Sequence, residues 1–207
     1  RQRQMCIRDS PLPRAVLFDR DGTLVVDTPY NGDPARVRPM AGAAVALSRI
    51  RTSGIPVGLI SNQSGVGRGL ITTGQLQAVT ERVNALLGPF AVILNCPHRP
   101  EDGCLCRKPA PGMVIEACQQ LGVSPQETLV VGDIGSDMAA AQAAGAQGVL
   151  VPNRVTRYEE VLAAPRVARS LLEVAELVCN PRVAHRDARE EPARDRPAVA
   201  RTAKVRP

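Results

Sequence analysis

The stretch AVLFDRDGT, residues 15–23, joins four apolar residues directly to a polar cluster. A short run without polar residues is typical of a strand that is buried on both faces, as in a parallel sheet. The run stops at Asp19, and Asp21 and Gly22 follow at once. We therefore predict a buried strand that ends in a turn carrying two carboxylates.

Short apolar runs and segments with helical spacing alternate along the rest of the chain. In 73–87, for example, Leu76, Val79 and Val83 recur on one helical face. Strands separated by such helices form right-handed crossovers and a parallel sheet. We predict an α/β fold, a Rossmann-like three-layer arrangement with a parallel sheet of five or more strands. The expected strands are 15–18, 56–60, 90–94, 128–132 and 148–151, and the expected helices are 42–53, 73–87, 111–121, 136–144, 157–163 and 169–178.

Polar clusters follow these strands at the end where parallel sheets bind ligands, beyond their carboxyl ends. The clusters are 19–21 after the first strand, 61–64 after the second and 133–137 after the fourth, with 107–108 just before the helix that leads into the fourth. We expect all of them to converge on one edge of the sheet.

The residue types in these clusters suit phosphoryl transfer. Of two carboxylates two residues apart, one can attack while the other handles the proton. A third carboxylate completes a set of hard oxygen ligands for Mg²⁺. Ser61 with its turn, and Lys108, offer a hydroxyl, N–H groups and a fixed positive charge to phosphate oxygens. Taken singly, each cluster is more simply a turn, a cap, a loop or a solvated lysine, but the four together favour a phosphoryl-transfer site.

These motifs resemble those of the haloacid dehalogenase (HAD) superfamily of phosphatases, over about residues 15–151. DRDGT at 19–23 is similar to the first motif of the superfamily, Ser61 to the second, Lys108 to the third and GDIGSD at 132–137 to the fourth.

The resemblance implies a mechanism through an aspartyl-phosphate. Asp19 would attack phosphorus, and Asp21 would protonate the leaving oxygen and then activate water. Ser61 and Lys108 would hold the phosphoryl oxygens. The Mg²⁺ ligands that the resemblance implies are Asp19, the backbone carbonyl of Asp21, and Asp133, with Asp137 in a supporting position or as an extra ligand.

CPH at 96–98 and CLC at 104–106 predict a second metal site. Three thiolates and one imidazole form a closed tetrahedral zinc site, and closed sites are structural. A disulfide or free thiols are the alternatives; the absence of an evident signal pattern favours a reducing cytoplasm and hence a metal. The predicted zinc ligands are Cys96, His98, Cys104 and Cys106, and Cys118 and Cys179 are expected to be ordinary residues.

The spacing leaves no room for a cap domain over the site. Only 39 residues separate Asp21 from Ser61, and 46 separate Ser61 from Lys108, and both intervals already contain a helix and a strand. Together, DRDGTLVVDTPYNGDPARVRPM, SNQSGVGRG and CPHRPEDGCLCRKPAPGM are similar to the capless D-glycero-D-manno-heptose 1,7-bisphosphate 7-phosphatase family, to which histidinol-phosphate phosphatases are closely related.

This closer resemblance implies removal of the C7 phosphate of a heptose bisphosphate, for nucleotide-activated heptose. Histidinol phosphate is the alternative substrate, and a non-catalytic zinc-braced binding module is a third reading. One departure is Ile134, where some heptose enzymes have Lys. The substrate contacts that the resemblance implies are Asp27, Thr28, Pro29, Tyr30, Asn62, Gln63, Ser64 and Arg107, besides the catalytic residues.

The net charge of +6 belongs to the two ends of the chain. Residues 1–14 carry +3 and residues 180–207 carry +4, whereas 15–179 carry −1. We expect a leader at 1–13 that is disordered or not native, a phosphatase domain at 14–179 and a disordered basic tail at 180–207. A near-neutral core with few aromatic residues argues against a nucleic-acid partner. No apolar run is long enough for a membrane span. A cytoplasmic location is expected because no signal pattern is evident, and a monomer is expected because nothing in the sequence suggests an extended dimer surface.

Overall fold

The computed structural model describes residues 12–180, and its strands form one parallel five-stranded sheet in the order β3-β2-β1-β4-β5. The strands are β1 (Ala15–Phe18), β2 (Val57–Asn62), β3 (Val92–Cys96), β4 (Thr128–Gly132) and β5 (Gln147–Leu150). The α-helices are α1 (Ala43–Thr52), α2 (Thr73–Leu87), α3 (Gly112–Leu121), α4 (Gly135–Ala144), α5 (Tyr158–Ala163) and α6 (Leu171–Cys179). The predicted α/β fold is confirmed.

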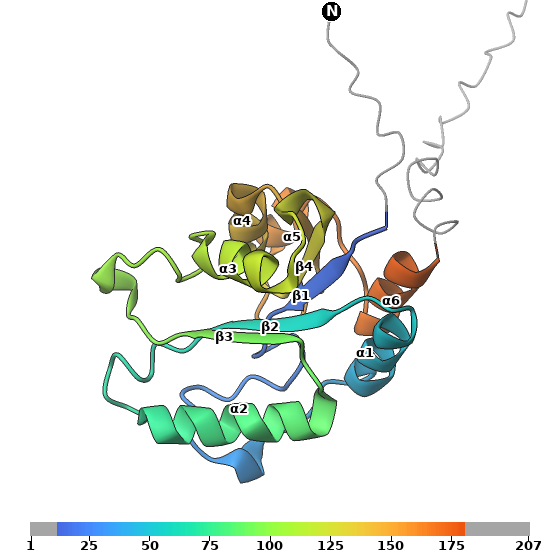
Figure 1. Cartoon of the computed structure of the whole chain (residues 1–207). Coiled ribbons are helices and arrows are strands. Elements are labelled where there is room, and N and C mark those ends of the chain that lie inside the picture. The colour runs from blue at the N-terminus through green and yellow to red at the C-terminus, as the bar shows by residue number, and fades with distance from the viewer. Residues whose placement is uncertain (1–11, 181–207) are drawn as a thin grey trace, which may run out of the picture.

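Helices cover both faces of the sheet, which gives three layers (Figure 1). One face packs against α1, α2 and α6, and the other against α3 and α4, with α5 beside α4. Alternate residues of β1 enter the two cores: Val16 and Phe18 join the first, and Leu17 joins the second. The uniformly apolar run at 15–18 is therefore explained by burial on both sides, and all four residues are fully buried.

Local signals set the ends of the helices. Thr72 and Gln75 form a capping box that starts α2 at the predicted residue. α3 ends at Gly122, whose φ of 64° lies in the left-handed region that favours glycine. The largest shift from prediction is in β3, which begins at Val92 and ends at Cys96, because the apolar residues 90–91 belong to the approach to the strand.

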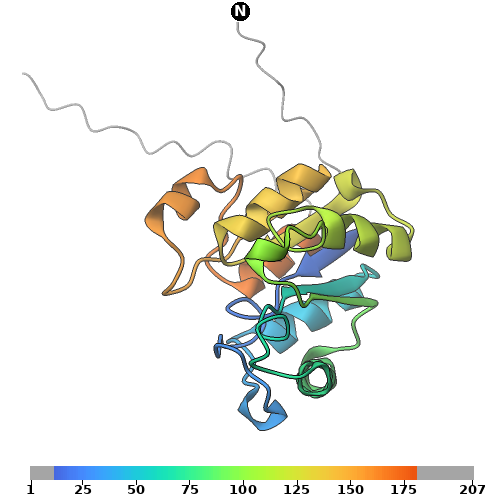
Figure 2. The ribbon, with the colours of Figure 1, turned by 90° about the vertical axis from the view of Figure 1, so that its left-hand side faces the viewer.

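Figure 2 looks onto the edge where the strands end and the long connections begin. Among the described residues, the segment between β1 and β2 contains one short 3₁₀ turn and α1, and the segment between β2 and β3 contains α2; neither contains a separate cap domain. Within the same residues no helix is both long and apolar enough to cross a membrane. The predictions for the leader and the tail fall almost entirely outside the described residues.

Candidate active site

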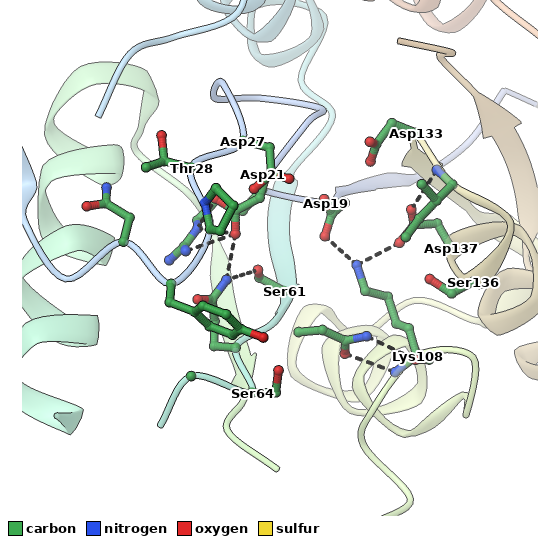
Figure 3. Close-up of a pocket in the computed structure, with 18 of the residues that line it drawn as sticks. Asp19, Asp21, Asp27, Thr28, Ser61, Ser64, Lys108, Asp133, Ser136 and Asp137 are labelled. Atoms are coloured by element: carbon green, nitrogen blue, oxygen red, sulfur yellow. Dashed lines mark hydrogen bonds and ion pairs between the residues drawn. The ribbon is translucent and has the colours of Figure 1, made fainter. Parts of the chain in front are cut away.

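A cavity of about 410 Å³ opens at the carboxyl edge of the sheet (Figure 3). Every residue predicted above to be catalytic or to contact substrate lines it, together with Asp133 and Asp137. The predicted convergence of the polar clusters is therefore observed. The cavity is also lined by Ile134, the departure noted above, and by residues to which the motifs assigned no role: Arg20, Asn31, Gly65, Ser136 and Val155.

Lys108 lies at the centre of the charges in this cavity. Its Nζ donates to Asp19 Oδ1 at 2.5 Å and to the carbonyl of Ile60 at 3.1 Å, and it pairs with Asp137 Oδ1 at 2.7 Å. Burial lowers the pKa of Lys108, but the carboxylates of Asp137 and Asp19 outweigh burial and hold that pKa above its ordinary value. Lys108 is therefore a permanent cation between two carboxylates.

Asp19 directly follows β1, and its backbone N–H donates to the carbonyl of Val131 in β4 at 2.9 Å. Burial raises the pKa of Asp19 well above its ordinary range, and the neighbouring Lys108 only partly opposes this effect. Asp19 is thus fixed between two strands, with Lys108 beside one of its two carboxylate oxygens.

Asn62, at the end of β2, holds the backbone of Lys108. Its Nδ2 donates to the Lys108 carbonyl at 2.9 Å, and its Oδ1 accepts from the Lys108 N–H at 3.0 Å. The family resemblance implied that Asn62 contacts substrate. In the structure Asn62 lines the cavity, and both polar atoms of its amide bind the backbone of Lys108, so these contacts position that lysine.

Asp21 is held by two donor side chains, one on each side of its carboxylate. The guanidinium of Arg20 pairs with it at 2.9 Å, and Gln63 Nε2 donates to its Oδ2 at 2.7 Å. The same Gln63 nitrogen donates to Ser61 Oγ, also at 2.7 Å. Arg20 is almost fully buried although it is charged. Gln63 therefore links Asp21 to Ser61, and Arg20 fixes Asp21 from the other side.

Three carboxylates form a group that we call the carboxylate cluster: Asp19, Asp133 and Asp137. One oxygen from each lies within 4.8 Å of the others, and all three residues are buried. Burial and the nearby Asp137 raise the pKa of Asp133 to about 6, although hydrogen bonds from Asn153 and Thr23 oppose the shift. Buried carboxylates that repel one another in this way are suited to a divalent cation, and hard oxygen donors fit Mg²⁺.

The rim of the cavity carries the other predicted substrate contacts, from Asp27 to Tyr30, together with Ser64 and Arg107. Tyr30 has a φ of 51°, in the left-handed region that non-glycine residues seldom adopt. Burial and the charge of Asp21 raise the pKa of Asp27. Ile134 also lines the cavity and is partly exposed, so an apolar side chain stands where some heptose enzymes carry Lys.

The four predicted zinc ligands meet at the end of β3, in a group that we call the cysteine–histidine cluster. Its sulfur–sulfur distances are 3.2, 3.4 and 3.6 Å, and His98 Nδ1 lies 3.3 Å from Cys106 Sγ and 3.6 Å from Cys96 Sγ. A Zn–S bond of about 2.3 Å places tetrahedral sulfurs about 3.8 Å apart. These donors fit a single zinc ion. Arg107, next to the cluster, donates from its Nη1 to the carbonyl of His98 at 3.3 Å.

Sequence reasoning missed the loop after β5, which reaches back to the site. Asn153 Nδ2 donates to Asp133 Oδ2 at 2.7 Å, and Thr156 Oγ1 donates to the Asp133 carbonyl at 2.6 Å. Neither residue belongs to a recognisable motif. The rule that ligands bind beyond the carboxyl ends of the strands was the one available signal, because this loop leaves β5 at that edge.

Comparison with known proteins finds relatives that are named phosphatases. Residues 105–175 match the HAD-hydrolase-like family. A curated protein of Mesorhizobium japonicum is 42% identical over 66% of this chain and 69% of its own length. One from Yersinia pestis is 32% identical over 79% of this chain and 94% of its own length. Both are named D-glycero-beta-D-manno-heptose-1,7-bisphosphate 7-phosphatase.

Solved structures show the same likeness. The D,D-heptose 1,7-bisphosphate phosphatase from B. bronchiseptica, complexed with magnesium and phosphate, is 32% identical with a TM-score of 0.72, covering 79% of this chain and 97% of that one. A HAD-like phosphatase from Mesorhizobium loti is 36% identical with a TM-score of 0.68, covering 81% and 84%. The chain therefore belongs to the HAD-like phosphatases, in the family whose curated members are named D-glycero-beta-D-manno-heptose-1,7-bisphosphate 7-phosphatases.

Proposed function

We propose that this phosphatase removes the C7 phosphate of D-glycero-beta-D-manno-heptose 1,7-bisphosphate in a Mg²⁺-dependent reaction, through an aspartyl-phosphate on Asp19. The observation that carries the chemistry is the buried Asp19, held against Lys108 at 2.5 Å and beside two further carboxylates. The names of the relatives carry the substrate and its anomer.

Asp19, the backbone carbonyl of Asp21, and Asp133 are the groups that would hold Mg²⁺. The clustering of buried carboxylate oxygens within 4.8 Å supports this assignment. When bound, Mg²⁺ supplies positive charge that offsets the negative charge of the phosphoryl oxygens. Asp137 would act through Lys108, with which it forms a buried ion pair at 2.7 Å.

The first half of the reaction transfers the phosphoryl group to the enzyme. A carboxylate oxygen of Asp19 attacks phosphorus, and the bond between phosphorus and the C7 oxygen of the sugar breaks. Asp21 gives its proton to that departing oxygen. Lys108 and Ser61 hold the phosphoryl oxygens, since both point into the cavity near Asp19 (Figure 3).

The second half returns the enzyme to its starting state. Asp21, now a carboxylate, takes a proton from a water molecule that attacks phosphorus. The bond between phosphorus and the Asp19 oxygen breaks, inorganic phosphate leaves, and Asp19 is again a carboxylate. The contacts of Asp21 with Arg20 and Gln63 support this step, because they hold its side chain in a fixed position at the cavity.

The cysteine–histidine cluster would hold a structural Zn²⁺. All four donors would be used by the metal, which leaves no open position for chemistry. Zinc would join the end of β3, at Cys96, to the part of the following connection that lies just before Arg107 and Lys108. Its role is therefore to fix where these two cations enter the cavity.

The test of this function is Mg²⁺-dependent phosphate release from both anomers of the heptose bisphosphate and from histidinol phosphate, with Asp19→Asn as the control. We expect the highest kcat/KM with the beta anomer and release only in the presence of Mg²⁺. A preference for histidinol phosphate would overturn the substrate while keeping the mechanism, and no release from any of the three would contradict the proposal. A monomeric state and a cytoplasmic location remain predictions.

A further inference from the structure

A single side chain in the loop after β5 connects the two loops that carry the proposed metal ligands. Asn153 Nδ2 donates to Asp133 Oδ2 at 2.7 Å and to the carbonyl of Gly22 at 3.1 Å. Asp133 follows β4, and Gly22 follows Asp21 in the turn after β1. One amide therefore joins the carboxylate of Asp133 to the peptide chain next to Asp21.

Asp133 depends on such donors for its orientation. It is only 3% exposed, so bulk water cannot hold its carboxylate. Its other oxygen, Oδ1, accepts from Thr23 Oγ1 at 3.1 Å. Gly22 has a φ of 84°, and a Cβ there would collide with Asp133 Oδ2. The turn after β1 thus approaches Asp133 as closely as glycine permits, and Asn153 donates hydrogen bonds to both the turn and Asp133.

Asn153 is itself held in place. Its Oδ1 accepts from the N–H of Val155 at 2.8 Å, and its own N–H donates to Thr156 Oγ1 at 2.9 Å. Thr156 Oγ1 in turn donates to the carbonyl of Asp133 at 2.6 Å. The loop is therefore anchored to the end of β4 at the main chain by Thr156 and at the carboxylate by Asn153.

We propose that Asn153 is a positioning residue for Mg²⁺ binding, because it fixes the Asp133 carboxylate relative to the turn that carries Asp19 and Asp21. This inference rests on the proposed function, in which those groups hold the metal. Hydrogen-bond partners that orient metal ligands typically contribute about 10- to 100-fold to metal affinity.

The test is a calorimetric Mg²⁺ titration of the metal-free, full-length chain carrying Asn153→Ser. The serine hydroxyl can still accept from the N–H two residues on, which preserves the turn. It is too short to reach Asp133 and Gly22 together. We expect the Kd for Mg²⁺ to rise about 10- to 100-fold, and Asn153→Ala to do the same.

Thr156→Val is the matched control, because it removes both hydrogen bonds of the Thr156 hydroxyl, to the Asp133 carbonyl and from the Asn153 N–H, and keeps the Asn153 side-chain amide. We expect it to weaken Mg²⁺ binding less than Asn153→Ser does. Equal losses in the two variants would mean that Asn153 acts only by shaping the loop, and would overturn the inference. Melting temperatures identify any variant that is not folded, in which case the other Asn153 variant decides.

Turnover provides a second readout. In Asn153→Ser the Mg²⁺ concentration that gives half-maximal phosphate release should rise, while kcat at saturating Mg²⁺ recovers most of the wild-type value. Unchanged Mg²⁺ affinity in Asn153→Ser, with normal binding by the wild type, would overturn this inference alone. A wild-type chain that binds no Mg²⁺ would overturn the proposed metal site and the inference together.

Discussion

The carboxylate cluster and the cysteine–histidine cluster lie on the same edge of the sheet but are supported in different ways. Asp19 and Asp133 follow directly on neighbouring central strands, and all three carboxylates are buried. In the other cluster only Cys96 belongs to a strand; His98, Cys104 and Cys106 lie in the connection that follows it, where Leu105 is 82% exposed.

This difference in support matches the different tasks proposed for the two clusters: catalysis for the carboxylate cluster and structural support for the cysteine–histidine cluster. The carboxylate cluster is positioned by regular structure, the ends of β1 and β4 and the first turn of α4, so its buried charges are held in place for chemistry. The cysteine–histidine cluster has little regular structure of its own, so zinc would supply the order that secondary structure does not. Mutations in the first should therefore affect turnover most, and mutations in the second should affect the local fold first.

The largest effect is expected for Asp19→Asn. The amide has nearly the same shape but is a poor nucleophile, so kcat/KM should fall at least about 10³-fold, or about 4 kcal/mol of transition-state stabilisation. The measurement is steady-state phosphate release, with zinc content as a check that the second cluster is intact. Asp33→Asn, which alters a cap outside the cavity, is the control. Substantial residual turnover in Asp19→Asn would remove the nucleophile assignment.

Cys104→Ser tests the cysteine–histidine cluster, where the local fold should be affected first and turnover second. Losing one thiolate should release zinc, loosen the connection between β3 and Lys108, and lower kcat/KM about 10- to 100-fold through misplacement of that lysine. Elemental analysis and limited proteolysis around residues 97–106 measure the change. Cys179→Ser is the control, since Cys179 lies in α6 outside the cluster. Full zinc content in Cys104→Ser would contradict the proposed zinc site.

Measuring the Kd for Mg²⁺ as a function of pH tests whether Asp133 of the carboxylate cluster is a metal ligand. In the metal-free chain the pKa of Asp133 is about 6, raised by burial and by Asp137. Mg²⁺ needs the carboxylate, so the apparent Kd should rise about tenfold per pH unit below that pKa. The sign for folding is opposite: because the folded pKa is raised, protonation of Asp133 stabilises the metal-free fold as pH falls through about 6. A Kd that is constant across this range would exclude Asp133 as a ligand.

The smallest effect is expected from removing residues 181–207. The last described helix ends at Cys179, and the residues that line the cavity lie between Asp19 and Val155. Both clusters should therefore be unchanged, with kcat and KM close to those of the full chain. A large drop in kcat would show that the tail takes part in function.

The sequence predicted the sheet well because burial on both faces leaves a clear signal. The strands at 15–18 and 128–132 and the helix at 73–87 begin and end at the predicted residues. β3 was placed two residues early, since Phe90 is apolar but packs from the loop and an apolar pattern alone does not distinguish the two. The register that pairs Cys96 with Asn62, and so brings the two clusters to one edge, depends on tertiary pairing.

The candidate site was predictable in its motif residues and not in its supporting contacts. Lys108, Asp19 and Asp133 carry residue types and spacings that have a chemical reading. The contact of Asn153 with Asp133 joins residues 20 apart in the sequence, with α4 and β5 between them, and Asn153 itself lies in a loop. The pairing of Arg20 with Asp21 depends on a rotamer. Such contacts follow from the packed fold, so no local pattern signals them.

In the proposed mechanism, Asp19 carries the phosphoryl group between the two halves of the reaction. The most direct measurement is rapid quenching of the enzyme during turnover of the labelled heptose bisphosphate, followed by peptide mass spectrometry. We predict a transient phosphate on the peptide that contains Asp19, formed before inorganic phosphate appears and absent from Asp19→Asn. Release of labelled phosphate without any phosphorylated peptide, or with the label on another residue, would contradict the account.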